Sequence, residues 1–298
     1  MGRVMILGAL LVAGGLASAM AAAQQQQARP PLPDLMKVKD NLYVITSSTP
    51  GPEFTGGNTG VFITDTGVIV VDTKLSGYGP TILDKIKKVT DKPVTMIINT
   101  HTHGDHTGSN EAFPVTVDIV AHENTKANMA KMDAFKGDKA QFLPKRTYTD
   151  KMSIGSGKNR VDLYYFGAGH TNGDTWVVYP ALRVLQTGDM FAWRDAPTID
   201  RNNGGSGLEY PKTLSKAIAA IKNVDTVIPG HSPVTTPKDL QEYQRFMTDW
   251  IAAVQSAAAA GKSIDEAAAS IDLTSKYPGY KNERYKNAIT AVYAELKK

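Results

Sequence analysis

The six positions from 101 to 106 constrain this chain more than any other part of its sequence. The chain has six histidines in 298 residues, and three of them, His101, His103 and His106, lie here beside Asp105. They follow the apolar run VTMIINT at 94–100, a pattern that favours a β-strand. Side chains two apart in an extended backbone point to the same side, so His101 and His103 can offer their imidazoles to one metal ion.

The residues after His103 predict a second metal position. Gly104 allows a sharp turn, after which Asp105 and His106 face away from the first position. We expect Thr107 or Ser109 to cap a short helix that follows. One loop cannot complete two coordination spheres, so further ligands must come from elsewhere in the chain.

Three later segments offer such ligands in one repeated context. Each is an apolar, strand-like run that stops at a glycine followed directly by a side chain able to bind a metal. The runs are LYYFGAGH, LRVLQTGD and DTVIPGH, and they end on His170, Asp189 and His231. Any one of these could be a polar loop or a packed histidine. Together with the first motif they predict a metal centre built from strand ends.

The rest of the sequence predicts a mixed α/β chain with helices at its end. Strands are expected at 41–47, 60–65, 67–72, 117–122, 160–166, 175–180, 182–187 and 225–230, and a helix at 80–90. From residue 236 an apolar stripe at helical spacing begins, and a last amphipathic helix is expected from Asn282 to the end. Residues 236–298 could form a separate module or a layer on the same domain, and we expect the layer.

The N-terminus has the features of an export signal. Arg3 precedes an apolar run and small residues, so we expect a signal peptide at 1–23 and an unstructured linker at 24–34. The apolar run of 13 residues, 4–16, is short of the roughly 20 that a spanning helix needs. We therefore expect a periplasmic or secreted protein with no stable membrane anchor after cleavage.

Charge and cysteine content limit the partners. A net charge of +4 without long runs of one sign argues against nucleic acid. The absence of cysteine excludes disulfides, thiolate ligands and a lipidated cysteine. A small-molecule substrate is the expected partner, and the oligomeric state stays open.

The motif set HTHGDH, GAGH, TGD and PGH resembles that of the metallo-β-lactamase superfamily, in order and spacing, from about residue 40 to 235. The resemblance implies an α/β fold of the αββα sandwich type over 35–235, with the C-terminal helices packed on it. It implies that His101, His103 and His170 bind one metal ion, that Asp105, His106 and His231 bind a second, and that Asp189 bridges both. It also implies that Asp105 orients a water and carries its proton, and that Asp72 holds the ligand loop by hydrogen bonds.

Nitrogen and oxygen ligands without sulfur suit two Zn²⁺ ions, although iron or manganese fit the same donors. Two such ions with a bridging hydroxide indicate hydrolysis, and an ester, thioester, lactone or similar acyl substrate is the leading prediction. A β-lactamase is the alternative, although the β-lactamases of this family resemble the pattern with a cysteine or serine where Asp189 stands. A di-iron oxidoreductase, a non-catalytic zinc protein and a nuclease fit less well.

Two loops could bind the substrate, and two further polar residues, Asp174 and His122, need an interpretation. The loops 47–58 and 191–207 are candidates for substrate binding, the second through Trp193, Arg194, Arg201, Asn202, Asn203 and Ser206. Asp174 is interpreted as a turn residue, with orientation of the strand after His170 as the alternative. His122 is expected to cap or pack a helix and is excluded from the site.

Overall fold

The computed structural model describes residues 29–47 and 51–297, and within these ranges it forms two mixed β-sheets. The first has seven strands in the order β1-β2-β3-β4-β5-β6-β7, and the second five in the order β12-β11-β10-β9-β8. The strands are β1 (Met36–Lys39), β2 (Leu42–Ile45), β3 (Thr59–Ile63), β4 (Val68–Val71), β5 (Val94–Ile98), β6 (Asp118–His122), β7 (Arg146–Tyr148), β8 (Lys151–Ile154), β9 (Val161–Tyr164), β10 (Trp176–Tyr179), β11 (Val184–Gln186) and β12 (Thr226–Ile228).

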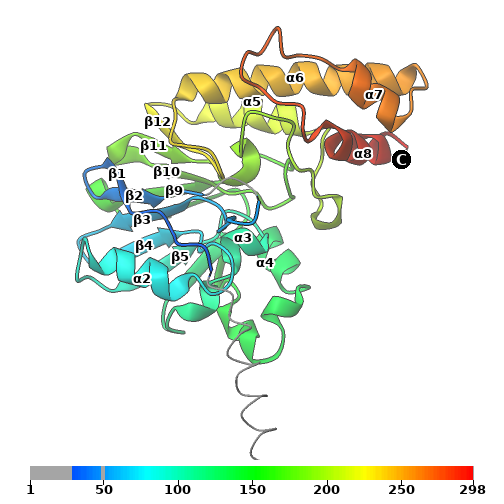
Figure 1. The fold of residues 1–298 in the computed structure, drawn as a ribbon. Helices are drawn as coiled ribbons and strands as arrows, with labels where there is room; N and C mark the ends of the chain where they lie inside the picture. The colour runs from blue at the N-terminus through cyan, green and yellow to red at the C-terminus, as the bar shows by residue number, and fades with distance from the viewer. Residues whose placement is uncertain (1–28, 48–50, 298) are drawn as a thin grey trace, which may run out of the picture. The chain divides into compact units, whose positions relative to one another are not determined.

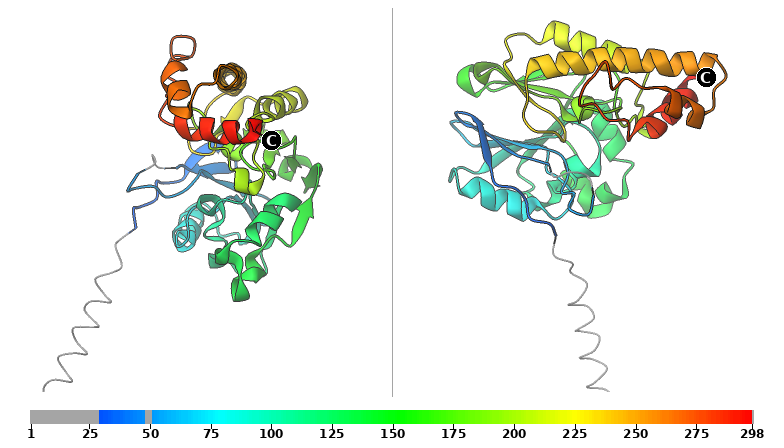
Figure 2. Two further views of the ribbon diagram at one scale, coloured as in Figure 1. Left: turned by 90° about the vertical axis from the view of Figure 1, so that its right-hand side faces the viewer. Right: turned by 45° about the horizontal axis from the view of Figure 1, so that its top comes forward.

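Helices cover the outer face of each sheet. In Figures 1 and 2, α5, α6, α7 and α8 lie on the side of the five-stranded sheet, and α2 and α4 on the side of the seven-stranded sheet. The α-helices are α2 (Gly79–Lys87), α3 (Gly104–Thr107), α4 (Glu123–Met129), α5 (Tyr210–Ala220), α6 (Pro237–Ala259), α7 (Ile264–Ser270) and α8 (Tyr285–Leu296). Short 3₁₀ turns are η1 (Asn110–Ala112), η2 (Asp133–Phe135), η3 (Gly137–Phe142), η4 (Gly157–Asn159), η5 (Pro180–Leu182), η6 (Gly188–Phe191) and η7 (Arg201–Asn203). This layering confirms the predicted αββα sandwich with C-terminal helices.

Three apolar layers hold the sandwich together. Between the sheets, side chains such as Phe62, Ile98, Val177 and Ile228 are buried. A second layer joins the seven-stranded sheet to α2, and a third joins the five-stranded sheet to α5, α6 and α8. The strands bury alternate side chains in different layers, so both faces of each sheet must be apolar.

The C-terminal helices share a core with the five-stranded sheet. The stripe singled out in the sequence on α6, which is Tyr243, Phe246, Met247, Trp250 and Val254, is buried throughout. It belongs to the same apolar cluster as Trp176 of β10 and Leu185 of β11. The final helix begins at Tyr285, three residues after the start expected from the sequence.

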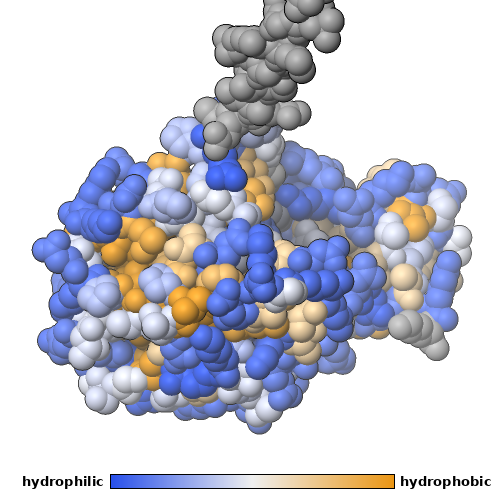
Figure 3. All heavy atoms as spheres, turned by 90° about the horizontal axis from the view of Figure 1, so that it is seen from below, coloured by the Kyte–Doolittle hydropathy of each residue, from blue (hydrophilic) through white to orange (hydrophobic). Residues whose placement is uncertain are grey.

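The compact unit begins at Leu32, which is buried against the seven-stranded sheet. Leu32 lies inside the segment 24–34 that was expected to be a linker. The signal peptide expected at 1–23 lies outside the described residues. Within those residues, no helix combines the length and the apolar character that crossing a membrane requires. Figure 3 looks from below onto the unit, where apolar side chains lie among hydrophilic ones.

Strand direction brings the site residues to one edge of the sandwich. β4 and β5 are parallel, and so are β11 and β12. β10 runs antiparallel to both β9 and β11, so β9 points the same way as β11. The carboxyl ends of these strands lead to Asp72, His101, His170, Asp189 and His231, and they meet at this edge.

Candidate metal centre

The loop after β5 carries four of the candidate ligands, and the structure groups them around two positions. His101, His103 and His170 offer ligand atoms that lie within 4.8 Å of one another. Asp105, His106 and His231 form a second such group. A third group, His101, His106 and Asp189, lies between them.

Ser109 stands at the N-cap of the short 3₁₀ helix η1, as expected, but its side chain makes no capping hydrogen bond there. The helix α3 begins at Gly104, so Asp105 and His106 lie in its first turn and Thr107 at its end. Ser109 instead serves the neighbouring helix α2, where its Oγ accepts hydrogen bonds from the backbone N–H groups of Tyr78 and Gly79.

The carboxylate of Asp189 lies between the two positions. Its Oδ1 is 3.3 Å from His106 Nε2, and its Oδ2 is 3.2 Å from His231 Nε2 and 3.7 Å from His170 Nε2. Asp105 Oδ2 approaches His231 Nε2 at 3.4 Å from the other side. The residues predicted from remote strand ends are therefore brought together with those of the loop.

Outer hydrogen bonds fix which ring nitrogen of each histidine faces the centre. His170 Nδ1 donates to the carbonyl of Thr198 at 2.7 Å, which leaves Nε2 as the inward lone pair. His103 is reversed, because its Nε2 lies 2.7 Å from Asp200 Oδ2 and its Nδ1 faces His170 Nε2 at 2.9 Å. His231 Nδ1 contacts Ser47 Oγ at 3.2 Å.

Asp72 organises the remaining two histidines of the loop. It accepts hydrogen bonds from Thr100 N at 2.8 Å, Thr100 Oγ1 at 2.7 Å and His106 Nδ1 at 2.7 Å. Because the Thr100 hydroxyl donates to Asp72, its oxygen is left to accept from His101 Nδ1, 3.0 Å away. The contacts expected of Asp72 are present, and both imidazoles turn Nε2 inward.

The donor set fits a cation. His101 Nε2 is buried and has no hydrogen-bond partner among the described residues. Burial, reinforced by His106 and His170, holds the pKa of His101 well below its usual range, so the ring is neutral and keeps its lone pair. Asp189 Oδ1 is also buried without a hydrogen bond. Lone pairs and carboxylates that converge without protons leave a place for positive charge.

The electrostatics of the second position point the same way. Burial lowers the pKa of His106, but Asp189, Asp105 and Asp72 outweigh it and raise the pKa well above the usual range. Burial raises the pKa of Asp189, but His231 and His106 outweigh it and hold the pKa well below its usual range. The carboxylates therefore favour positive charge at this point.

Two glycines permit the close approach of the loops to the site. A Cβ at Gly57 would lie 2.2 Å from His106 Cε1, and one at Gly230 would lie 2.0 Å from Asp189 Oδ1. Any other residue would displace these side chains. The loops after β2 and β12 therefore pack directly on the ligands.

His122 and Asp174 lie outside the three ligand groups. His122 is the N-cap of α4, where its Nδ1 accepts from Asn124 N, and its ring stacks on Tyr165 at 4.0 Å. Its expected capping and packing role is confirmed. Asp174 is buried and accepts from Thr171 N and Oγ1, so it closes the turn that follows His170. Burial raises the pKa of Asp174 to about 7.

Of the residues named in the loop 191–207, Trp193 packs against the candidate ligand His231. Its ring centroid is 4.5 Å from that of His231, and Phe54 lies 5.5 Å from the same ring. Arg284 stacks on the Trp193 ring, with its guanidinium carbon 3.8 Å from the ring centroid. Two aromatic rings from separate loops thus flank one candidate ligand.

The other named loop residues make structural contacts. Arg194 pairs with Asp239, and Arg201 and Ser206 contact Glu295. The side chain of Asn203 and the backbone N–H groups of Asn202 and Asn203 donate to Asp200. These contacts shape the loop rather than the space above the ligands.

Sequence reasoning missed Asp200 and Lys74. Asp200 lies inside the predicted substrate loop, where His103 holds the pKa of its carboxyl well below the usual range. Lys74 is fully buried, with Nζ donating to Thr46 O at 3.1 Å and Gly57 O at 2.7 Å. Burial lowers its pKa to about 7. Neither residue stands in a motif, and their partners are remote in sequence.

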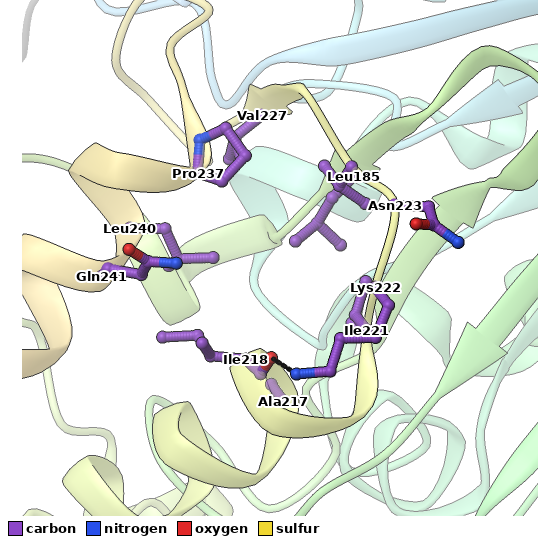
Figure 4. A pocket seen from close by; sticks show the side chains of 11 residues that line it. Leu185, Ala217, Ile218, Ile221, Lys222, Asn223, Val227, Pro237, Leu240 and Gln241 are labelled. Carbon is purple, nitrogen blue, oxygen red and sulfur yellow. Dashed lines mark hydrogen bonds between the residues drawn. The ribbon is translucent and has the colours of Figure 1, made fainter.

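Two cavities have linings that include none of the candidate ligands. In Figure 4 a cavity of about 240 Å³ is surrounded by side chains from α5, the turn after it, β11, β12 and the start of α6. Lys222 Nζ donates to Ile218 O at 3.4 Å across its wall. A second cavity of about 220 Å³ lies behind α3, lined by Gly104, Thr107, Met132, Phe135 and Phe142 among others.

Comparisons with known proteins agree with this geometry. The sequence pattern described as "Metallo-beta-lactamase superfamily" matches residues 52–231. The "Metallo-beta-lactamase type 2" of Elizabethkingia meningoseptica is 30% identical over 234 residues, which are 75% of this chain and 86% of that protein. "Metallo-beta-lactamase IND-1" of Chryseobacterium indologenes is 26% identical over 203 residues, 65% of this chain and 80% of that one.

Solved structures share the fold. A metallo-beta-lactamase from Pontibacter korlensis superposes with a TM-score of 0.63 at 20% identity, over 73% of this chain and 99% of that chain. The DIM-1 metallo-beta-lactamase gives 0.60 at 22% identity, over 74% and 99%. The family pattern matches more than half of the length of this chain. The chain therefore belongs to the metallo-beta-lactamase superfamily and is a metal-dependent hydrolase.

Proposed function

We propose that the protein is an exported hydrolase that binds two zinc ions and cleaves an ester, thioester, lactone or similar acyl compound. His101, His103 and His170 would hold one ion and Asp105, His106 and His231 the other, with Asp189 between the two groups. The observation that carries the proposal is the position of Asp189, whose two oxygens approach histidines of both groups at 3.2 to 3.7 Å. Iron or manganese fits the same nitrogen and oxygen donors, so zinc is the first choice on ligand chemistry alone.

Bound zinc supplies a Lewis acid and makes water acidic near neutral pH, so no serine or cysteine nucleophile is required. The protein's own contribution is orientation. Thr198, Asp200 and Asp72 fix the rings of His170, His103 and His106, so that one chosen nitrogen of each is available.

Asp105 is the residue proposed to handle the proton. The exposed fraction of its side chain is 21%, against 8% for Asp189, so a substrate or water can reach it more easily. Its Oδ2 lies 3.4 Å from His231 Nε2 and 3.6 Å from His106 Nε2, within the second group. A carboxylate in this place can accept a proton from the attacking water and pass it to the leaving group.

The rings of Trp193 and Phe54 supply an apolar wall beside His231. An aryl or alkyl group of the substrate can pack there while its acyl carbon lies over the two positions. This favours substrates with an apolar group next to the bond that is cleaved.

A β-lactamase is the second candidate, because the curated relatives are named metallo-beta-lactamases. The carboxylate of Asp189 favours the acyl substrates, because the residues around it would hold two ions whose Lewis acidity suits activated bonds. A β-lactam also requires stabilisation of an amide nitrogen as it leaves.

Kinetics with zinc-loaded protein separate the two candidates. We expect an aryl ester, a thioester or a lactone to give a higher kcat/KM than penicillin, cephalosporin or carbapenem compounds. A β-lactam that is the best substrate by about tenfold, or ~1.4 kcal/mol in the transition state, would establish the second candidate instead.

Export rests on the sequence of residues 1–23. We expect the mature protein in the periplasm or the medium, with an N-terminus near residue 24. Mass spectrometry of the protein from each cell fraction tests this. A full-length chain found in the cytoplasm would contradict it.

A further inference from the structure

The final helix α8, drawn in red in Figure 1, lies beyond the residues matched to the family, 52–231. Its residue Glu295 nevertheless contacts the loop that follows the candidate ligand Asp189. The carboxylate accepts hydrogen bonds from Ser206 Oγ and from Gly207 N, the latter at 2.9 Å. Arg201 Nη1 lies 3.4 Å from its Oε2. One side chain thus holds three points of the loop 201–207.

The same loop begins with Asp200, the partner of His103. Arg201 Nη1 also donates to Gly205 O at 2.7 Å, and Gly205 N donates to Asp200 O at 2.8 Å. Asp200 Oδ2 then reaches His103 Nε2 at 2.7 Å. A continuous series of contacts therefore runs from α8 to a candidate metal ligand.

The loop is also held from its other side, where Asn172 N donates to Asn203 O at 3.0 Å. Its backbone is joined to the segment of His170, since Asp200 N donates to His170 O at 2.9 Å and Ser206 N donates to Gly169 O at 2.9 Å. The exposed fraction of the Glu295 side chain is 15%, so its charge is largely shielded from water and its contacts count for more than those of an exposed pair. Loss of Glu295 would remove the side-chain acceptor that Ser206, Gly207 and Arg201 share.

We propose that Glu295 is a positioning residue of the hydrolase, which fixes Asp200 through the loop 201–207 and thereby sets the orientation of His103 in the first metal position. The proposal rests on the proposed function, because it requires that His103 binds a metal ion. It makes residues 236–298 part of the catalytic unit.

The test uses cobalt(II) as a spectroscopic probe of the metal-free full chain. We expect Glu295→Ala to change the visible absorption of the bound cobalt, and to weaken one of the two binding steps by about tenfold, the lower end of the effect seen when outer hydrogen bonds to ligands are removed. With zinc we expect kcat to fall while KM changes less than about twofold, because the substrate does not touch Glu295.

Two further variants make the test specific. Glu295→Gln keeps an acceptor oxygen for Ser206 and Gly207 and loses the charge that faces Arg201, so its cobalt spectrum and affinity should lie between those of wild type and Glu295→Ala. Glu283→Ala removes an exposed carboxylate before the same helix, which pairs with Lys281, and should match wild type in every measurement.

The outcomes separate the two proposals. If the wild-type protein takes up no cobalt, the proposed function fails and this inference fails with it. If wild type binds cobalt but Glu295→Ala and Glu295→Gln give the wild-type spectrum and affinities, only the positioning role is overturned. Where Glu295→Ala does not fold, as judged by circular dichroism of the metal-free protein, the Glu295→Gln variant decides the question alone.

Discussion

The carboxylate of Asp72 lies 2.7 Å from His106 Nδ1 and is buried at the end of β4. The same carboxylate accepts both the backbone N–H and the hydroxyl of Thr100, the residue just before the ligand loop. The backbone of Asp72 has a φ of 63°, in the left-handed region that few residues other than glycine adopt. This strained backbone conformation places the Asp72 carboxylate where it holds both the ligand loop, through Thr100, and the ring of His106.

Asp72→Asn is therefore expected to weaken the second metal position. The asparagine oxygen can still accept from Thr100, but its amide would face His106 Nδ1 and favour the tautomer that protonates Nε2. We expect about 10- to 100-fold weaker binding of one zinc ion, measured by competition with a chelator. Asp118→Asn, a change at a half-exposed residue that pairs with Arg146, serves as the control and should bind as wild type does. Equal affinities in both variants would contradict the role given to Asp72.

Asp105→Ala should cost far more activity than His122→Ala. The first change removes a proposed ligand and proton carrier, and about 10²- to 10⁴-fold in kcat/KM is expected from the loss of general acid–base catalysis alone. The second removes the cap of α4 and the hydrogen bond from His122 Nε2 to Thr149 O. This loss is expected to lower the free energy of unfolding by about 1 kcal/mol.

Kinetics and thermal melting of both variants check this pair of expectations. Comparable losses in kcat/KM at unchanged metal content would mean that the site has been placed wrongly.

Trp193→Ala is expected to raise KM for aryl esters more than it lowers kcat. The ring lies beside His231 and is proposed to contact the substrate away from the reacting bond. An aromatic contact of ~0.5–1.5 kcal/mol corresponds to roughly 2- to 12-fold in KM. Trp193→Phe keeps a ring there and should recover most of the affinity. Steady-state kinetics with matched aryl and methyl esters provide the measurement, and an effect equal for both esters would exclude aromatic contact with the substrate.

Asp239→Asn should destabilise the protein at neutral pH and have little effect in acid. Burial raises the pKa of Asp239, but hydrogen bonds from Thr235 and Thr236 and the charge of Arg194 outweigh it and lower the pKa to about 2. The carboxylate caps α6, so its contribution is present above the unfolded pKa of about 3.9 and is lost as the pH falls through about 2.

We expect Asp239→Asn to lose about 1 kcal/mol of unfolding free energy at pH 7, with the difference from wild type vanishing near pH 2. Urea unfolding across this pH range measures it, and Asp265→Asn, at an exposed carboxylate that pairs with Lys286, is the control. A difference that stays constant from pH 7 to pH 2 would contradict the assignment.

The sequence predicted the central strands and the residues at their ends, because both are local. An apolar run followed by a glycine and a histidine can be recognised within about eight residues, the usual length of a strand and its turn. The strands β1, β7 and β8 were not expected. Each lies at the margin of its sheet, where one side chain in two faces water and the apolar signal is weak, as in MKVK and KMSI.

The residues that support the ligands could not be found in this way. Asp200 and His103 are 97 positions apart, and Ser206 and Glu295 are 89 apart. Their meeting depends on how the loop 191–207 folds back onto the segment 169–172 after β9 and on where α8 packs. Those contacts follow from the assembled core and leave no periodic pattern in the sequence.

Metal analysis of the purified, zinc-loaded protein determines whether the seven side chains hold two metal ions. We expect two equivalents of zinc per chain, falling to one in His231→Ala. A ceiling of one equivalent in wild type, unchanged by the loss of His231, would contradict it.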